Sequence, residues 1–320
     1  MRTRIRIVRG GFLALSLAMV ASCERSAERV AASADRAMEV AASGTGDRSG
    51  PAAPIPPDSG SAIERDRQIF ESTILRAQRE GLPARPLGER IATLGSWFVG
   101  SEYIPGTLEV VPEGLVINLR QFDCVTFVES MLAMARVLGT PEPTFDRFMD
   151  EVRTIRYRDG VITGYASRLH YFSDWIHENE KRGIVKNITA SLGGIPLTEP
   201  TSFMSSHRDL YSALQSPEVF AQVRAQEQAL NSISRYWIPK AQIASIAGEL
   251  QNGDIIAATS ATEGLDIAHT GIVIRVDGKP HLMHAPLVGS VVEISERPLA
   301  DRIQGISGQT GIMVARPTGN

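Results

Sequence analysis

The C-terminal part of the chain restricts the possible folds most, because it holds a series of short segments typical of strands. Between Asp254 and Pro317 the sequence is rich in β-branched residues, and Gly, Asp and Pro separate the segments. Asp277-Gly278 favours a tight turn between two of them. We therefore expect antiparallel strands at DIIAATS, HTGIVIRV, HLMHAP, SVVEIS and GIMVARP.

The residues before this strand region are expected to be mainly helical. A helix is predicted over 62–81 and a shorter one over 87–98, while 140–250 is interpreted as mostly helical and irregular. Helices followed by an antiparallel sheet predict the α+β fold class. The apolar face of the first helix is expected to comprise Ile63, Ile69, Phe70, Ile74 and Leu75.

Composition and charge narrow the classes of function. The chain has 320 residues, of which 43% are apolar, and its net charge is −3. This balance is typical of a globular protein, and the length suffices for a core that needs no disulfides. A chain without excess basic charge cannot bind nucleic acid mainly by neutralising phosphates. We therefore expect no nucleic-acid partner.

The first 23 residues resemble the signal sequence of a bacterial lipoprotein. Arginines precede a mostly apolar run over 11–22, which is too short for a stable membrane span. The run ends in VASC, which resembles a lipobox and implies that residues 1–22 are removed and that Cys23 is lipidated. By resemblance to lipoprotein sorting rules, Glu24 implies the outer membrane, facing the periplasm of the cell envelope. An ordinary cleaved signal peptide is the alternative.

The segment after Cys23 separates this leader from the folded part. Residues 23–61 are rich in Ala, Ser, Gly and Pro without an apolar period, which predicts a flexible tether before one domain over 62–320. A lipidated Cys23 would leave Cys124 without an intrachain disulfide partner. Structural cysteines in an oxidising compartment usually form pairs, so Cys124 is either a reactive thiol or a buried small apolar residue.

Cys124 is predicted to start a helix. Apolar residues recur at steps of three and four after it, Asp123 is a plausible N-cap, and Gly139 and Pro141 mark the stop. Free N–H groups in a first turn favour a thiolate and can stabilise an oxyanion. The charge of Asp123 opposes the thiolate, so a nearby imidazole is needed.

Two histidines are predicted to lie together on the hairpin around Asp277-Gly278. A two-residue loop pairs Val276 with Lys279, and this register places Gly271 opposite His284. Because side chains alternate along a strand, His269 and His284 share a face, about 6–8 Å apart as diagonal neighbours. By the same alternation His281 points to the other face.

A thiol and two imidazoles are the groups that a cysteine hydrolase needs. One imidazole takes the proton of the thiol, and a second polar group orients that imidazole. The alternative, a metal bound by His281 and His284, lacks an HExxH motif or a paired-cysteine ligand set. We therefore expect neither a metal nor a cofactor.

The same segments resemble a known superfamily. DCVTFVESMLAMAR, NGDIIAA, HTGIVI and LMHA, in this order, resemble the NlpC/P60 papain-like cysteine hydrolases of the cell wall. FVGSEYIPGTLE, FDCVTFVE and IRYRDGVITGYASRLHYFSDWI resemble its DUF1460 branch more specifically. The resemblance spans about residues 87–317. It implies a papain-like core, with a nucleophile helix packed on an antiparallel sheet and large helical insertions.

The resemblance also implies an activity and roles for residues. It implies an N-acetylmuramoyl-L-alanine amidase that acts on peptidoglycan fragments, in particular 1,6-anhydro-muropeptides. Cys124 corresponds to the nucleophile, His269 to the base and His284 to the third residue that orients it, while Asp254 is interpreted as structural. Tyr103 or Gln121 would assist the Cys124 amide in binding the oxyanion. The expected substrate contacts, chosen from the matched blocks, are Tyr103, Asp123, Tyr165, Ser167, Arg168, His170 and Tyr171.

Two other functions remain open on the sequence. An endopeptidase that cuts between D-glutamate and diaminopimelate would use the same nucleophile and differ in how its cleft selects the substrate. A non-catalytic wall-binding lipoprotein would retain a cleft without the nucleophile and base, so the presence of Cys124, His269 and His284 disfavours it.

Overall fold

The computed structural model describes residues 61–287 and 290–319. The predicted signal peptide, the predicted lipidation site Cys23 and the tether up to residue 60 lie outside the described residues. Within those two stretches, none of the helices combines the length and the apolar character that crossing a membrane requires. The described part contains helices and an antiparallel sheet, so the predicted α+β class is confirmed.

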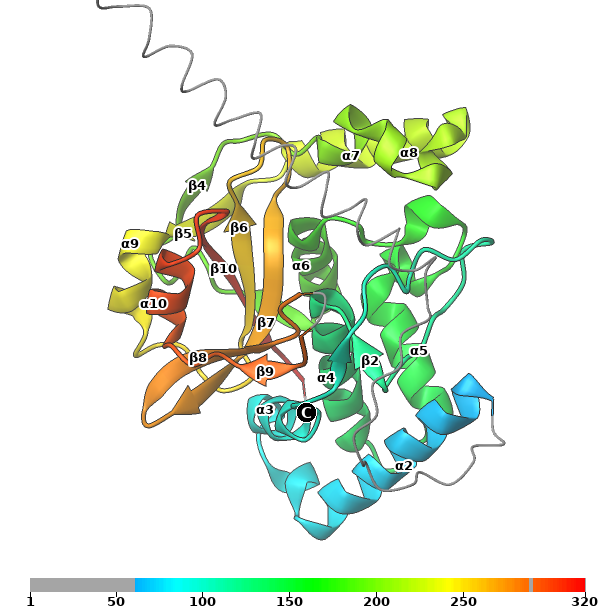
Figure 1. The fold of residues 1–320 in the computed structure, drawn as a ribbon, viewed down its shortest axis with the longest axis vertical. Helices are drawn as coiled ribbons and strands as arrows, with labels where there is room; N and C mark the ends of the chain where they lie inside the picture. The colour runs from blue at the N-terminus through cyan, green and yellow to red at the C-terminus, as the bar shows by residue number, and fades with distance from the viewer. Residues whose placement is uncertain (1–60, 288–289, 320) are drawn as a thin grey trace, which may run out of the picture. The chain divides into compact units, whose positions relative to one another are not determined.

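Helices cover one face of the sheet, as Figure 1 shows. The central one begins at Cys124 and packs against both its neighbouring helices and the strand that contains His269. The helices of this layer are α2 (Ala62–Arg79), α3 (Leu87–Ser96), α4 (Cys124–Leu138), α5 (Phe145–Arg156) and α6 (Phe172–Lys181).

The main sheet is antiparallel throughout its described pairings. Its strand order is β4-β5-β10-β6-β7-β8-β9, and β3 also pairs with β10. A separate parallel pair joins β1 (Glu102–Tyr103) to β2 (Gln121–Phe122), directly before α4. The strands of the main sheet are β3 (Val185–Asn187), β4 (Ile195–Leu197), β5 (Arg235–Pro239), β6 (Ile255–Ser260), β7 (Ile267–Val276), β8 (Lys279–His284), β9 (Glu293–Ile294) and β10 (Gln309–Pro317).

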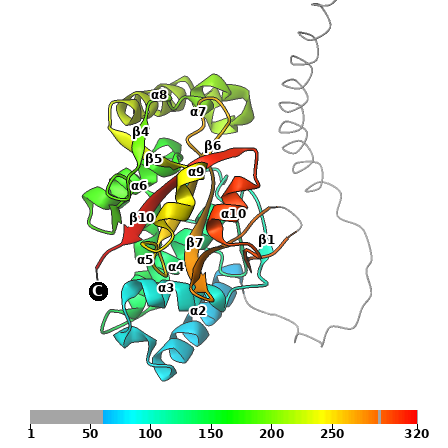
Figure 2. The same ribbon diagram turned by 90° about the vertical axis from the view of Figure 1, so that its left-hand side faces the viewer.

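Both faces of the central strands are buried. Alternate side chains of β6 point to opposite sides, so that Ile255 joins the core under α4 and Ile256 joins a second core. The short helices α9 (Lys240–Ile243) and α10 (Leu299–Gln304) cover this second core and lie in front of the sheet in Figure 2. Burial on both sides explains why these strands are nearly continuously apolar rather than alternating.

A third, smaller core lies beside α8 (Pro217–Asn231) and the short α7 (Phe203–Ser206), at the top of Figure 1. Tyr171 and Met204 belong to it. This layer lies within the region predicted to be helical and irregular, and it forms one side of the cavity described below.

Parts of the secondary-structure prediction need correction. The helix over 62–81 is confirmed, but Ile63 and Leu75 are exposed, and Asp66 lies on its buried face instead. The Asp66 carboxylate accepts the N–H of Leu119 at 2.8 Å and pairs with Arg120 at 3.1 Å, which compensates its burial.

The irregular region also contains strands that the periodicity did not reveal, namely β3, β4 and β5. Each is at most five residues long, and β4 and β5 contain Pro196 and Pro239, so none presents the alternation that predicts a strand.

The predicted hairpin is confirmed in its register. Val276 pairs with Lys279 across Asp277-Gly278, and the ladder continues to Ile272 opposite Met283. A Cβ atom at Gly271 would lie 2.8 Å from the side chain of Leu282. The position therefore requires glycine, because the neighbouring side chain occupies the space of any larger residue.

Candidate active site

Cys124 lies at the N-terminus of α4, as predicted. Asp123 is the N-cap: its carboxylate accepts the N–H of Thr126 at 2.7 Å, and the Thr126 hydroxyl accepts the N–H of Asp123 at 2.9 Å. This capping box fixes the first turn, so the side chain of Cys124 has a defined position. The first N–H groups of a helix have no intrahelical partner and remain available to an anion.

The first turn of α4 is held against β7. The Thr270 hydroxyl donates a hydrogen bond of 2.8 Å to the main-chain carbonyl of Cys124. Since Thr270 directly follows His269, this bond brings the start of α4 beside the histidine strand. The side chain of Cys124 is half-buried and forms no disulfide.

The surroundings of Cys124 favour the neutral thiol. Burial, and then the charge of Asp123, raise the pKa of the thiol to about 11. Contacts with the main chain and hydroxyl of Thr270 act in the opposite direction without offsetting these effects. The predicted preference for a thiolate at a helix N-terminus is therefore outweighed here by desolvation and by the adjacent carboxylate.

His269 and His284 form a hydrogen-bonded pair. The distance from His269 Nε2 to His284 Nδ1 is 3.0 Å, and the rings lie edge to face at 88°. The predicted shared face is confirmed, and the rings are closer than the backbone spacing suggested because both side chains turn toward each other. His281 points to the other face, where its Nδ1 lies 2.8 Å from the carbonyl of Ser295.

Both rings of the pair are neutral near pH 7. Burial, and then the charge of Arg302 on α10, lower the pKa of His269 to about 3. Burial, His269 and Arg302 lower that of His284 to about 2. A neutral His269 has one nitrogen bonded to His284, so its Nδ1 is the atom that remains to accept a proton.

A cavity of about 280 Å³ opens next to the N-terminus of α4. Asp123 and Val125, the chain neighbours of Cys124, both line it, whereas Cys124, His269 and His284 do not. Its wall includes Tyr165, Arg168 and His170, so four of the seven predicted substrate contacts meet at this cavity. Glu109, Glu129, Arg156 and Tyr211 line it as well.

Arg168 is one of two arginines in the cavity wall, the other being Arg156. Arg168 is buried, and it pairs with Glu109 at 2.8 Å and Glu113 at 3.2 Å. Its guanidinium lies 5.0 Å from the centre of the Tyr165 ring. Glu113 is buried, whereas half of the Glu109 side chain is exposed. Glu109 is therefore the partner that a ligand carboxylate could replace.

Tyr165 and His170 form a close aromatic pair on the same wall, with their ring planes tilted by 33°. Their ring centres are 4.3 Å apart, and His170 Nε2 lies 2.9 Å from the carbonyl of Tyr165. Burial, and then the charge of Arg168, lower the pKa of His170 to about 3, so the ring is neutral. The two rings give this wall the aromatic lining that is common in ligand pockets.

Tyr103 belongs to a different element, β1, and is near enough to Cys124 for the two groups to interact electrostatically. Burial, and then the charges of Cys124 and Asp123, raise the pKa of its hydroxyl, which therefore keeps its proton. Gln121 is less available, because its amide donates to Glu102 at 2.8 Å. Of the two predicted oxyanion donors, Tyr103 is the unengaged one.

Ser167 and Tyr171 do not reach the cavity. The Ser167 hydroxyl donates to the carbonyl of Gly164 at 2.6 Å and closes a local turn. Tyr171 is buried in the third core, where its hydroxyl donates to Glu227 at 2.7 Å. Both side chains are used inside the fold, so their positions do not support the predicted substrate contact.

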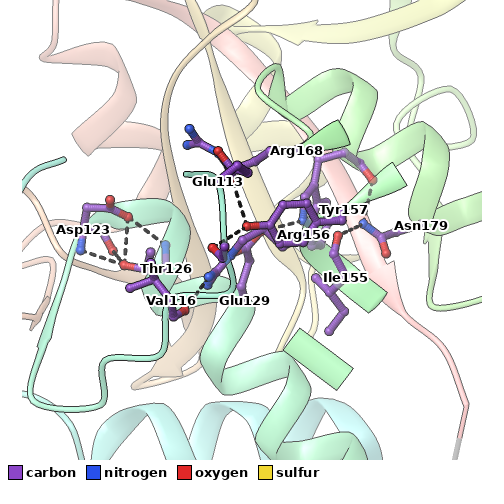
Figure 3. Close-up of polar contacts among 12 residues, drawn as sticks. Glu113, Val116, Asp123, Thr126, Glu129, Ile155, Arg156, Tyr157, Arg168 and Asn179 are labelled. Atoms are coloured by element: carbon purple, nitrogen blue, oxygen red, sulfur yellow. Dashed lines mark hydrogen bonds and ion pairs between the residues drawn. The ribbon is translucent and has the colours of Figure 1, made fainter. Parts of the chain in front are cut away.

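A buried ion pair, drawn in Figure 3, joins α4 to α5 in the wall of the cavity. Arg156 Nε lies 2.7 Å from Glu129 Oε2, and both side chains are almost completely buried. Arg156 also donates to the carbonyl of Val116 at 2.6 Å, and Trp175 donates to Glu129 at 3.2 Å. Sequence reasoning missed these residues. An acid within the apolar run VTFVESMLAMARVL was the one available signal.

Asp254 has the structural role predicted for it. It is buried and pairs with Arg316 through both oxygens, at 2.7 and 2.8 Å. This bidentate pair links the start of β6 to the end of β10.

The fold and the site together define a class: an α+β protein with a helix-start thiol packed against a strand that contains one of two paired histidines. The AmiA-like family, described as N-acetylmuramoyl-L-alanine amidase-like, matches residues 93–310. Because this match covers more than half of the chain, including Cys124 and the histidine hairpin, the chain belongs to that family. Among curated proteins, no sequence matches it.

Solved structures resemble the chain over most of its length. An N-acetylmuramoyl-L-alanine amidase from Bacteroides uniformis is 37% identical, with a TM-score of 0.69 over 73% of this chain and 99% of that one. A Bacteroides fragilis protein described as a candidate xylanase is 39% identical, with a TM-score of 0.65 over 69% and 98%. A Legionella pneumophila protein of the DUF1460 family shares the fold, at 20% identity and a TM-score of 0.57 over 81% and 97%.

Proposed function

We propose that the protein is a cysteine amidase of the papain-like NlpC/P60 type, which hydrolyses the bond between N-acetylmuramic acid and L-alanine in peptidoglycan fragments. The observation that supports this most is the 3.0 Å hydrogen bond between His269 on β7 and His284 on β8. Thr270, the residue after His269, contacts Cys124, so the histidine pair and the thiol belong to one site. Membership of the amidase-like family supports the choice of the N-acetylmuramoyl-L-alanine bond as the one that is cleaved.

In the first step, Cys124 attacks the lactyl carbonyl carbon while His269 accepts the thiol proton. Because the thiol and both imidazoles are neutral in the resting site, proton transfer accompanies the attack instead of preceding it as a stable ion pair. The negative charge on the carbonyl oxygen would be stabilised by the main-chain N–H of Cys124 and by the hydroxyl of Tyr103.

In the second step, the protonated His269 gives its proton to the alanine nitrogen, the C–N bond breaks, and a thioester remains on Cys124. Water then attacks the thioester with His269 as the base, which releases the sugar acid and restores the thiol. His284 holds His269 in place throughout through the bond between Nε2 and Nδ1.

The stem peptide would lie in the cavity beside α4. Arg168 is the group that would pair with a carboxylate of the peptide, in exchange for the half-exposed Glu109. The paired rings of Tyr165 and His170 would contact the peptide or the sugar. We propose that 1,6-anhydro-muropeptides are the preferred substrates, which rests on the resemblance to the DUF1460 branch.

A glycosidase, the function suggested for the Bacteroides fragilis protein, fits the site less well. Glycoside hydrolysis commonly needs two free carboxyl groups facing each other. The acids that line the cavity are engaged: Asp123 caps α4, Glu129 pairs with Arg156, and Glu109 pairs with Arg168. A D-glutamate/diaminopimelate endopeptidase remains the main alternative, since it would use the same thiol and imidazoles.

The cellular place is proposed from the N-terminal pattern and the family. A lipidated Cys23 would anchor the enzyme to the outer membrane, with the domain facing peptidoglycan fragments in the periplasm. Acyl chains contribute about 0.8 kcal/mol for each buried methylene, so several chains on one cysteine would suffice for stable anchoring.

The decisive experiment identifies the bond that is cut. Purified full-length protein is incubated with anhydro- and reducing muropeptides, and the products are identified by mass. We expect an intact stem peptide and a free sugar acid from the wild type, and neither from Cys124→Ala or His269→Gln. His281→Gln is the matched control, because this histidine of the same hairpin bonds to Ser295 on the opposite face, and it should retain activity. Cleavage within the stem peptide would support the endopeptidase, and full activity of Cys124→Ala would refute the proposal.

A further inference from the structure

His284, the residue proposed to orient His269, faces an acidic side chain. His284 is completely buried, and its Nε2 atom has no hydrogen-bond partner in the structure. The nearest acid is Glu293, whose Oε1 lies 3.6 Å from that nitrogen. This is an ion-pair distance, slightly too long for a hydrogen bond.

The position of Glu293 follows from the sheet. Glu293 on β9 is the direct cross-strand partner of His284 on β8, and partners in an antiparallel pair project from the same face. Half of the Glu293 side chain is exposed, so its carboxylate is in contact with water although it faces a buried ring.

A neutral pair of imidazoles can share its hydrogen bond in two directions. In one direction His269 donates from Nε2, and its Nδ1 keeps a free lone pair that can accept the thiol proton. In the other direction His284 donates from Nδ1, and His269 then carries its proton on Nδ1 and cannot act as a base. Only the first direction is catalytically competent, so some feature of the protein must select it.

Proton counting identifies that feature. In the competent direction, the proton of the neutral His284 ring is on Nε2, which faces Glu293. In the other direction a lone pair of Nε2 would face the negative carboxylate. Glu293 therefore stabilises the competent tautomers of both rings and destabilises the others.

A second charge next to the rings opposes the change that catalysis requires. Arg302 on α10 lies close enough to both imidazoles for its charge to disfavour their protonation, and its buried Nη1 has no hydrogen-bond partner. The charge of Glu293 also interacts with Arg302, where it raises the pKa of the guanidinium and so favours its charged form. Its carboxylate is thus the acid that counters Arg302 when His269 becomes an imidazolium.

We propose that Glu293 is a positioning residue that acts through His284 to set the tautomers of the pair, so that His269 presents an unprotonated Nδ1 to Cys124. This inference rests on the proposed function, and it adds a fourth group to the chain from thiol to base to orienting residue.

The test compares three variants of the full chain. Glu293→Gln removes the charge but keeps an acceptor oxygen, and Glu293→Leu removes both. Glu296→Gln, an exposed acid three residues further along, is the matched control. The tautomers of His269 and His284 are read from the ¹⁵N shifts of their ring nitrogens, and kcat and KM are measured on the muropeptide that the wild type cleaves.

We expect the wild type and Glu296→Gln to hold the proton of both rings on Nε2. Glu293→Leu should show protonation of Nδ1 and a kcat lowered by about tenfold or more with little change in KM, as expected when a supporting residue is lost. Glu293→Gln should fall between them. Wild-type ring shifts and kcat in Glu293→Leu would overturn the proposal.

The two readouts separate this inference from the function itself. If the wild type cleaves no muropeptide, the amidase proposal fails, yet the ring shifts still report whether Glu293 sets the tautomers. If the wild type cleaves and Glu293→Leu is equally active with unchanged shifts, the amidase stands and the role of Glu293 is refuted. Should Glu293→Leu fail to fold, the isosteric Glu293→Gln decides, because unaltered shifts and kcat in it would also count against the charge.

Discussion

Replacing Arg156 by Met should destabilise the protein strongly, because it leaves a carboxylate buried without its partner. Arg156 and Glu129 are joined at 2.7 Å, and their side chains are 3% and 2% exposed. Met has a similar length and no charge, so the variant removes the ion pair without leaving a large cavity. The bond from Arg156 to the carbonyl of Val116 is also lost.

The expected magnitude follows from burial. Breaking a buried pair by removing one partner costs about 3–5 kcal/mol, since the remaining charge loses its compensation. This is a large share of the roughly 5–15 kcal/mol by which domains are stable. Burial already raises the pKa of Glu129, and Arg156 opposes this rise. Without Arg156 the carboxyl can take up a proton, so the destabilisation should become smaller as the pH falls from 8 to 5.

The assay is urea unfolding followed by tryptophan fluorescence, since Trp175 contacts Glu129 directly. Arg147→Met is the matched control: its pair with Glu142 at 3.2 Å is exposed, with 51% and 74% of the two side chains accessible. An exposed pair contributes about 0–1 kcal/mol, so the control should unfold almost like the wild type.

A double variant completes the test. Adding Glu129→Gln to Arg156→Met removes the unpaired charge and should recover a large part of the lost free energy of unfolding. The reasoning is refuted if Arg156→Met loses less than about 1 kcal/mol at pH 8, which is the value of a surface pair, or if the second substitution adds to the loss.

Two further predictions concern the charges around the site. Asp123→Asn keeps an N-cap acceptor but removes the charge that raises the thiol pKa, so the pKa of Cys124 should fall below about 11 while α4 remains capped. The rate of alkylation of Cys124 at increasing pH, followed by mass, measures this pKa, and an unchanged pH profile would contradict the role given to Asp123. The pKa of His170 is about 3 in the fold against an ordinary 6.5, so the unfolded chain binds the extra proton and stability is lost as the pH falls below about 6.5. His170→Gln should therefore lose less free energy of unfolding between pH 7 and pH 4 than the wild type, by up to roughly 3 kcal/mol; equal losses in both proteins would show that His170 does not titrate in this way.

Local patterns determined much of this protein without a structure. The helix after Cys124, its cap at Asp123 and the register of the hairpin all follow from neighbours in the sequence, and the structure agrees with them. Such features depend on hydrogen bonds between residues a few positions apart and on the alternation of side chains along a strand. The shared face of His269 and His284 could be predicted for the same reason.

Short or proline-containing strands could not be found in this way. β3, β4 and β5 owe their existence to pairing with β10 and with one another, and no local pattern anticipates such partners. The face of α2 was partly misassigned for a similar reason: Asp66 is buried because Leu119 and Arg120, more than fifty positions later, satisfy its carboxylate.

The balance of electrostatic effects at the site was decided by tertiary structure. From the sequence, a helix N-terminus favours a thiolate and the charge of Asp123 opposes it, whereas the largest effect, burial, raises the thiol pKa and arises only in the folded protein. Arg302 and Glu293, which act on the two imidazoles, come from α10 and β9 and belong to none of the motifs. A sequence specifies which ionisable groups are present and what lies next to them along the chain. The energy of a charge, however, depends on its distance in space from other charges and from water, and only the folded arrangement sets those distances.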